Sequence, residues 1–129
     1  MKESMISVLL VEPCKRPKVI KIENTLEKLQ ELVGGYIEVL YPFEDKVAVI
    51  ANEERKINGL PLNRALYDDE DKIYDIIVGP FLMVGIDGED FVSLPSELSL
   101  LYFNLFWHAE RFVKLNGEIY AVPCKPKES

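Results

Sequence analysis

The chain has 129 residues, of which 48% are apolar, and its 22 acidic and 15 basic residues give a formal net charge of −7. This length suits one domain, and the apolar fraction can close one hydrophobic core. We therefore expect a single domain over residues 1–129, with a short solvated tail from about residue 125. The negative charge repels a phosphate backbone at long range and argues against direct nucleic-acid binding.

The sequence contains no candidate membrane segment or secretion signal. Its apolar runs, such as Ile6–Val11, are far shorter than the roughly 20 residues that span a bilayer. The first residues also lack the longer apolar stretch and the small-residue cleavage site of a signal peptide. We therefore expect a cytoplasmic protein. In a reducing compartment Cys14 and Cys124 are expected to be free thiols. Intracellular cysteines are usually inert, so we favour inert thiols over a functional cysteine pair.

The first third of the chain has the pattern of a hairpin followed by a helix. Ile6–Val11 is apolar and β-branched, as in a strand buried on both faces, and Lys18–Glu23 alternates in polarity as a second strand does. Thr25–Val33 has an apolar stripe at helical spacing, with Asn24 as its candidate cap. Gly34 and Gly35 then end the helix, since glycine accepts the left-handed conformation found at helix termini.

The middle of the chain alternates strands with polar segments. Tyr36–Tyr41 and Val47–Ala51 read as a second hairpin. Residues 52–66 have no regular period and are rich in Asn, Gly and Pro, so they are expected to be loop with at most a short helical turn near the end. Tyr74–Val78 and Phe81–Ile86 form one long strand or two, because the intervening proline removes a ladder donor.

The last third is expected to contain a helix and a closing hairpin. Residues 96–108 have a helical pattern. Their predicted core face carries Leu98, Leu101, Tyr102, Leu105 and Ala109. Asn116-Gly117 between two strand-like runs is a strong signal for a type I′ turn. Together the elements predict an α+β fold with a mixed, largely antiparallel sheet and two helices, starting ββαββ and closing with a C-terminal hairpin.

The polar segment 52–66 carries the first candidate site. Asn58, Asn63 and Arg64 could present amide donors and a planar guanidinium to a carboxylate or phosphate, with Glu53 or Glu54 as a balancing charge. Such a set would bind a small anionic ligand. The alternative is structural: Asn and Arg side chains often bond the carbonyls of an irregular segment, and this is the more common use of such residues.

Other chemistry has weaker support. The acidic turn Asp68–Asp71 does not match the spacing of a helix–loop–helix calcium site and is expected to be solvated. His108 is the only histidine and is placed at a helix end. We find no catalytic, phosphate-loop or dinucleotide motif. We therefore expect no metal and no cofactor, and no enzyme activity is indicated.

The second predicted helix carries the second candidate site. Leu100, Phe103 and Trp107 recur at spacings of three and four on a face apart from the core stripe. If the sheet leaves this face uncovered, it is a candidate interaction surface for a protein partner or a second copy of the chain. If strands cover both faces, the same residues are core.

Several strings in the sequence resemble a known family. They are Leu10-Val11-Glu12-Pro13, Thr25-Leu26-Glu27-Lys28-Leu29-Gln30, Gly34-Gly35-Tyr36-Ile37-Glu38, Asn52-Glu53-Glu54, Asn58-Gly59-Leu60-Pro61-Leu62-Asn63-Arg64 and Asp75-Ile76-Ile77-Val78-Gly79-Pro80-Phe81. The family consists of uncharacterised domains of unknown function from Gram-positive bacteria, their phages and mobile elements. The resemblance covers roughly Val8 to Gly85 and implies a phage or mobile-element accessory setting, but it supplies no catalytic residue.

Two classes of function remain open from the sequence. The first is a non-catalytic binding or protein-interaction module, which would use the apolar helix. The alternative is a small anionic-ligand binder or an enzyme, which would use the polar segment 52–66. An exposed apolar helix face would favour the first class, and a concave pocket lined by polar groups would favour the second.

Overall fold

The computed structural model describes residues 3–54 and 59–127, and the elements below lie within these ranges. They are β1 (Met5–Val11), β2 (Lys18–Glu23), α1 (Leu26–Val33), β3 (Ile37–Leu40), β4 (Val47–Asn52), β5 (Leu62–Tyr67), β6 (Ile73–Val78), β7 (Phe81–Asp87), β8 (Asp90–Val92), α2 (Ser96–Leu105), β9 (Ala109–Leu115) and β10 (Glu118–Cys124). This confirms the α+β class with antiparallel sheets and two helices. Neither described helix is long and apolar enough to cross a membrane.

The strands are divided among three sheets, where the sequence predicted one mixed sheet. The largest sheet has six strands in the order β2-β1-β7-β4-β3, with β8 added to β7. The β5–β6 and β9–β10 hairpins are separate two-stranded sheets. Within the described ranges every strand pair is antiparallel. Short connections explain the hairpin pairs, because parallel neighbours need a long crossover. The β1–β7 and β4–β7 pairs are also antiparallel, although longer stretches of chain connect them.

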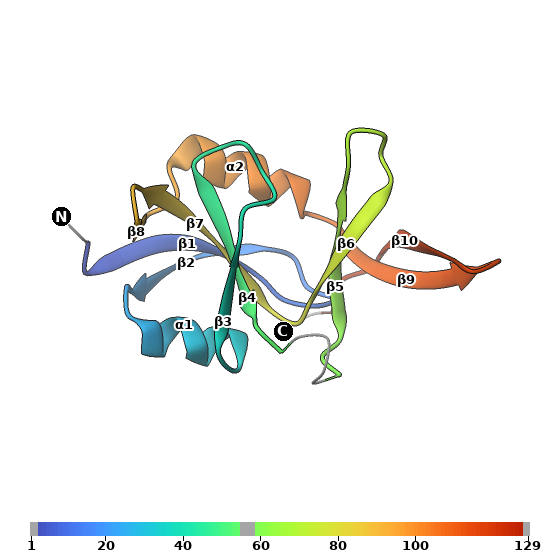
Figure 1. The fold of residues 1–129 in the computed structure, drawn as a ribbon, viewed down its shortest axis with the longest axis horizontal. Helices are drawn as coiled ribbons and strands as arrows, with labels where there is room; N and C mark the ends of the chain where they lie inside the picture. Colours follow the sequence, from blue (N-terminus) through green and yellow to red (C-terminus); the bar gives the residue numbers. More distant parts are fainter. Residues whose placement is uncertain (1–2, 55–58, 128–129) are drawn as a thin grey trace.

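The six-stranded sheet lies between two cores (Figure 1). On β1, Ile6, Val8 and Leu10 face the cluster beneath α1, whereas Leu9 and Val11 face the cluster beneath α2. This two-residue alternation with apolar side chains on both faces confirms the predicted doubly buried strand. The β5–β6 hairpin contributes to the α2 side of the sheet, since its side chains join that cluster.

The first helix is capped one residue later than predicted. The Thr25 hydroxyl accepts a hydrogen bond from the Lys28 amide, while the Asn24 side chain donates to the carbonyls of Glu3 and Phe91. Asn24 is buried and therefore ties neighbouring segments together rather than capping the helix. Gly34 ends the helix with a φ of 83°, as its residue type predicted.

The second helix buries only part of the predicted core face. Tyr102 and Phe106 are buried and Leu98 packs beside them, but Leu101 and Leu105 are 52% and 57% exposed. The helix ends at Leu105, so that His108 lies beyond it. The prediction was right for Leu98, Tyr102 and Ala109 and wrong for Leu101 and Leu105. The helix is apolar around much of its circumference, and sequence period alone cannot choose between two overlapping apolar stripes.

Residues 62–67 form strand β5, although the sequence predicted loop or a helical turn there. The register of β5 with β6 shifts between Leu62 and Arg64, which leaves Asn63 as an extra residue in the ladder. A bulge of this kind lets two consecutive side chains be buried instead of alternating between two faces. Asn63 and Arg64 are both buried, with exposed fractions of 0% and 1%.

The C-terminal hairpin extends away from the rest of the domain (Figure 1). Asn116 and Gly117 link β9 to β10 with φ angles of 52° and 82°, which are the positive values that a type I′ turn requires. The chain then returns to the β1–β2 turn, where the Lys127 amide donates to the Cys14 carbonyl. The described part of the predicted tail is thus bonded to the β1–β2 turn, while Lys125 and Lys127 are exposed.

Candidate functional site

The structure separates the residues of the predicted polar site. Glu53 follows strand β4 and is exposed, whereas Asn63 and Arg64 are buried side by side in β5. Asn58 lies outside the described residues. The structure therefore brings Asn63 and Arg64 together in the interior and leaves Glu53 on the surface.

The Arg64 guanidinium is bonded to backbone carbonyls and to one amide oxygen. Its Nε donates to the Phe106 carbonyl at 3.2 Å, and its Nη2 donates to the same carbonyl at 3.0 Å and to the Lys15 carbonyl at 2.6 Å. Its Nη1 donates to the carbonyl and Oδ1 of Asn63 at 3.3 and 2.8 Å. These five bonds match the five N–H donors of the side chain. The expected partners Glu53 and Glu54 are not among the acceptors.

Asn63 completes this buried cluster. Its Nδ2 donates to the Val11 carbonyl at 2.9 Å and to the Gly79 carbonyl at 2.8 Å. The two side chains thus join strand β5 to the end of β1, the β6–β7 turn, the β1–β2 turn and the end of α2. Burial lowers the pKa of Arg64, and the nearby charge of Glu110 opposes that shift. A charged guanidinium with these satisfied donors, together with the Asn63 amide, stabilises the junction of these five segments.

In the acidic turn before β6, a carboxylate is hydrogen-bonded to backbone amides of the same turn. The Asp68 carboxylate accepts hydrogen bonds from the Glu70 and Lys72 amides at 2.9 and 3.0 Å. Across residues 3–54 and 59–127, no group of three or more His, Cys, Asp or Glu side chains could hold a metal ion.

The exposed side of α2 forms an apolar surface, which we call the leucine face. It consists of Leu100, Leu101 and Leu105 on the helix and Trp107 just beyond its end, whose exposed fractions are 63%, 52%, 57% and 36%. Phe103, the third predicted interaction residue, is half-buried against the core and packs on Trp107 with ring centroids 5.3 Å apart. The sequence identified Leu100 and Trp107 but assigned Leu101 and Leu105 to the core.

The Trp107 end of the leucine face is held rigidly. The Arg16 guanidinium lies 3.8 Å from the Trp107 ring centroid, and its Nη1 donates to the Trp107 carbonyl at 3.0 Å. A cation over an aromatic face fixes both side chains. Sequence reasoning missed this contact because 91 residues separate its two partners.

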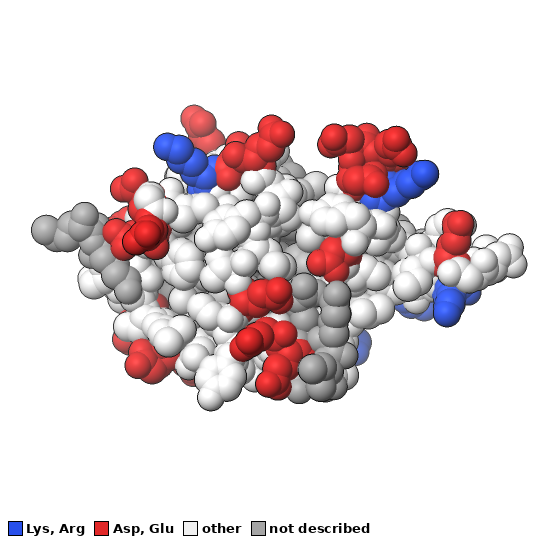
Figure 2. All heavy atoms as spheres, in the orientation of Figure 1, with Lys and Arg blue, Asp and Glu red and all other residues white. Residues whose placement is uncertain are grey.

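Acidic side chains lie at the other end of α2. Glu97 is exposed in its first turn, and the β3–β4 loop carries exposed Glu44 and Asp45. This loop is fixed to the helix by the Tyr102 hydroxyl, which donates to the Asp45 carboxylate at 2.7 Å. Figure 2 shows that acidic side chains outnumber basic ones on the face turned to the viewer, including the area over α2 and this loop.

Comparison with known proteins places the chain in a family without supplying a chemistry. The family model described as a domain of unknown function, DUF3846, matches residues 5–106, and the chain belongs to this family. Searches of curated proteins and of solved structures gave no significant match. The matched region extends past the expected Val8–Gly85 through α2, so the leucine-face helix belongs to the family domain and β9–β10 lies beyond the match.

Proposed function

We propose that this DUF3846 member is a non-catalytic interaction module that binds a protein partner through the leucine face of α2. The observation that carries the proposal is the exposure of three leucines on one short helix, with a tryptophan just beyond its end, while the opposite side of the helix is core. Large contiguous apolar surfaces on small domains tend to mark partner sites. We also propose a phage or mobile-element accessory setting, which rests on the sequence resemblance alone.

The chemistry around the leucine face favours a particular partner. Glu97 lies one helical turn before Leu101, which in turn lies one turn before Leu105, so an acidic group flanks the apolar stripe. Glu44 and Asp45 add negative charge beside the helix. An amphipathic helix with a leucine stripe and flanking lysines offers apolar side chains to the leucines and opposite charge to the acidic groups.

A pair of designed peptides tests the proposal. Both are amphipathic helices with the same leucine stripe, and they differ only in carrying lysine or glutamate beside it. Fluorescence anisotropy should give a roughly micromolar Kd for the lysine peptide and much weaker binding for the glutamate peptide. The double variant Leu101→Glu/Leu105→Glu should abolish binding because it places charges in the centre of the apolar surface.

Leu26→Glu provides the matched control. Leu26 is 53% exposed on α1, so the substitution makes the same chemical change at similar exposure on another helix. It should leave the affinity for the lysine peptide unchanged. Failure of both peptides to bind, or equal binding by the double variant and the wild type, would overturn the proposal. Self-association that the double variant removes would instead identify a second copy as the occupant.

The alternative function, a small anionic-ligand binder or enzyme built on residues 52–66, has less support. All five N–H donors of Arg64 are occupied by protein oxygens, and the side chain is 1% exposed. A ligand at this position would have to displace bonds that join β5 to the β1–β2 turn and to the end of α2. We therefore propose a structural role for Asn63 and Arg64.

A further inference from the structure

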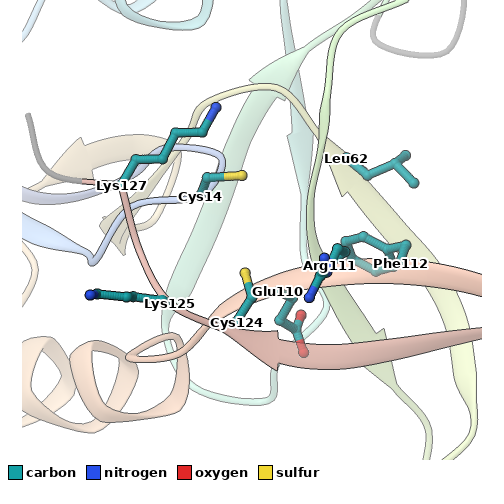
Figure 3. Close-up of a pocket in the computed structure, with 8 residues that line it drawn as sticks. All are labelled: Cys14, Leu62, Glu110, Arg111, Phe112, Cys124, Lys125 and Lys127. Atoms are coloured by element: carbon teal, nitrogen blue, oxygen red, sulfur yellow. The ribbon is translucent and has the colours of Figure 1, made fainter.

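Two adjoining hollows lie where the C-terminal segment meets the β1–β2 turn. The first, of about 450 Å³, is bordered by Cys14 on the β1–β2 turn, by β9 and by Cys124 at the end of β10 (Figure 3). The second, of about 530 Å³, lies between the β1–β2 turn and the segment after β10. Lys125 and Lys127 line both hollows. We call the second hollow the basic groove.

The basic groove concentrates positive charge in a negatively charged protein. Its lining contains five cationic side chains, Lys15, Arg16, Lys18, Lys125 and Lys127, and one acidic side chain, Glu12. The whole chain has only 15 basic residues and a net charge of −7. One third of the basic residues therefore surround one hollow, where their mutual repulsion is unfavourable without an anion.

Three of these cations have no carboxylate partner in the described part of the chain. Glu12 pairs with Lys18 at 3.3 Å, and Arg16 is committed to Trp107. Among residues 3–54 and 59–127, no carboxylate lies within ion-pair distance of Lys15, Lys125 or Lys127. Their ammonium groups are therefore available to a ligand.

The backbone beneath these lysines is nevertheless held in place. The Lys15 carbonyl accepts a hydrogen bond from Arg64 at 2.6 Å, and the Lys15 amide donates to the Glu12 carbonyl at 3.2 Å. On the opposite wall, the Lys127 amide donates to the Cys14 carbonyl at 2.6 Å. The two walls are thus tied together, which reduces the entropy that is lost when a ligand binds between them.

We propose that the basic groove binds a compact polyanion that carries two or more phosphate groups. Lysine ammonium groups bind phosphate as point charges, and three unpaired ones match the charge of a diphosphate or triphosphate better than that of a single carboxylate. The volume of about 530 Å³ lies within the usual range of small-molecule sites. This inference goes beyond the proposed function and is independent of the leucine face.

Inorganic tripolyphosphate is the probe for the first test. Isothermal titration calorimetry at low ionic strength should show saturable binding of one tripolyphosphate per chain, and binding should weaken as sodium chloride is added. The double variant Lys125→Gln/Lys127→Gln should raise the Kd about tenfold or more, because it removes two charges from one wall. Citrate, a carboxylate polyanion, should bind distinctly more weakly than tripolyphosphate.

A matched control separates the site from general electrostatics. Lys46→Gln/Lys114→Gln makes the same change in net charge at exposed lysines outside the groove, and should alter the Kd by less than about threefold. No saturable binding by the wild type, or equal weakening by the two double variants, would overturn the proposal. Equal affinity for citrate would overturn the assignment to phosphate.

The neighbouring thiols supply a second readout. Cys14 and Cys124 are free, and their sulfurs face the same hollow, which shares two lysines with the basic groove (Figure 3). Bound tripolyphosphate should slow alkylation of these thiols by neutral iodoacetamide severalfold, and the Lys125→Gln/Lys127→Gln variant should remove the protection. Protection that persists unchanged in this variant would contradict the placement of the anion.

Discussion

The buried guanidinium of Arg64 and the exposed lysines of the basic groove are two cationic regions that meet at one residue. Arg64 donates to the Lys15 carbonyl, while the Lys15 side chain lines the groove. The Arg64 donors are all used by the protein, whereas the ammonium groups of Lys15, Lys125 and Lys127 pair with no carboxylate of the described chain.

This difference separates structural from binding roles. A buried charge must be satisfied inside the protein, so removing it destabilises the fold. An exposed charge is already satisfied by water, so removing it changes affinity for a ligand but barely changes stability. The two regions should therefore respond in opposite ways to substitution, although both contain cations close to the same turn.

The largest expected effect is on Arg64. Arg64→Lys keeps the charge but loses the planar set of donors, so at least one carbonyl among those of Phe106, Lys15 and Asn63 loses its partner. We expect the free energy of unfolding to fall by about 3 kcal/mol, measured by urea denaturation. The affinity for tripolyphosphate should stay unchanged under conditions in which the variant remains folded.

Substitution of the groove lysines should affect ligand affinity and leave stability unchanged, which is the opposite of the effect expected for Arg64→Lys. Lys125→Gln/Lys127→Gln should unfold at the same urea concentration as the wild type while losing affinity for tripolyphosphate. If Arg64→Lys instead had wild-type stability and lost tripolyphosphate binding, then the buried guanidinium would be a ligand-binding group, and the distinction between the two regions would fail.

The next effect is on Asn63. Asn63→Ala removes the donor to the Val11 and Gly79 carbonyls and the acceptor for Arg64. We expect a loss of about 2 kcal/mol in urea denaturation, because buried polar groups are left without partners. Asn116→Ala is unsuitable as a control because of its positive φ, so exposed Asn104→Ala on α2 serves instead and should change stability by less than about 0.5 kcal/mol.

A smaller effect is expected at Tyr102, which fixes the β3–β4 loop to α2. Burial, together with the hydrogen bond to Asp45, raises the pKa of Tyr102 above its usual value of 10. The protonated hydroxyl therefore stabilises the fold below pH 10, and this contribution is lost as the pH rises above it. Tyr102→Phe should lower stability by about 1 kcal/mol at pH 7. The difference from the wild type should shrink above pH 10 in urea titrations; a difference that grows would contradict this linkage.

Local patterns predicted the elements whose structure depends on near neighbours. The apolar run of β1, the glycine that ends α1 and the Asn116-Gly117 turn were all readable, because each follows from residues a few positions apart. The second helix was located, but its buried face was predicted only in part. Tyr102 is buried as expected, whereas Leu101 and Leu105 are exposed, because only the position of the sheet decides how far the buried stripe extends around an apolar helix.

The contacts of the candidate sites were beyond local inference. Arg64 bonds residues 42 and 49 positions away, and its burial depends on a bulge that no sequence signal marked. The sequence placed Asn63 and Arg64 in one candidate site and proposed Glu53 or Glu54 as the partner of Arg64, but the acceptors are backbone carbonyls and the Asn63 amide oxygen. The basic groove is formed by segments near opposite ends of the chain, so the sequence does not show that their lysines and arginine lie close together.

The smallest expected effect on stability is at Cys14 and Cys124, which border the hollow next to the basic groove. Both thiols are free and half-buried, and we predict that they are reduced in the native protein and dispensable for the fold. Serine has nearly the same shape as cysteine. At Cys14, where φ is 61°, the substitution therefore leaves the backbone strain of a non-glycine residue unchanged. Cys14→Ser and Cys124→Ser should therefore each change stability by less than about 0.5 kcal/mol.

Thiol titration of freshly purified protein checks the redox part of this prediction. Two sulfurs should react without any reductant once the protein is unfolded in denaturant. Their arrangement makes the test a demanding one, because Cys14 and Cys124 border one hollow and the Lys127 amide bonds the Cys14 carbonyl. Two sulfurs that react only after reduction would prove a disulfide between the β1–β2 turn and the end of β10. Such a disulfide would link the β1–β2 turn covalently to the segment that carries Lys125 and Lys127. Its reduction would then be expected to change the affinity for tripolyphosphate.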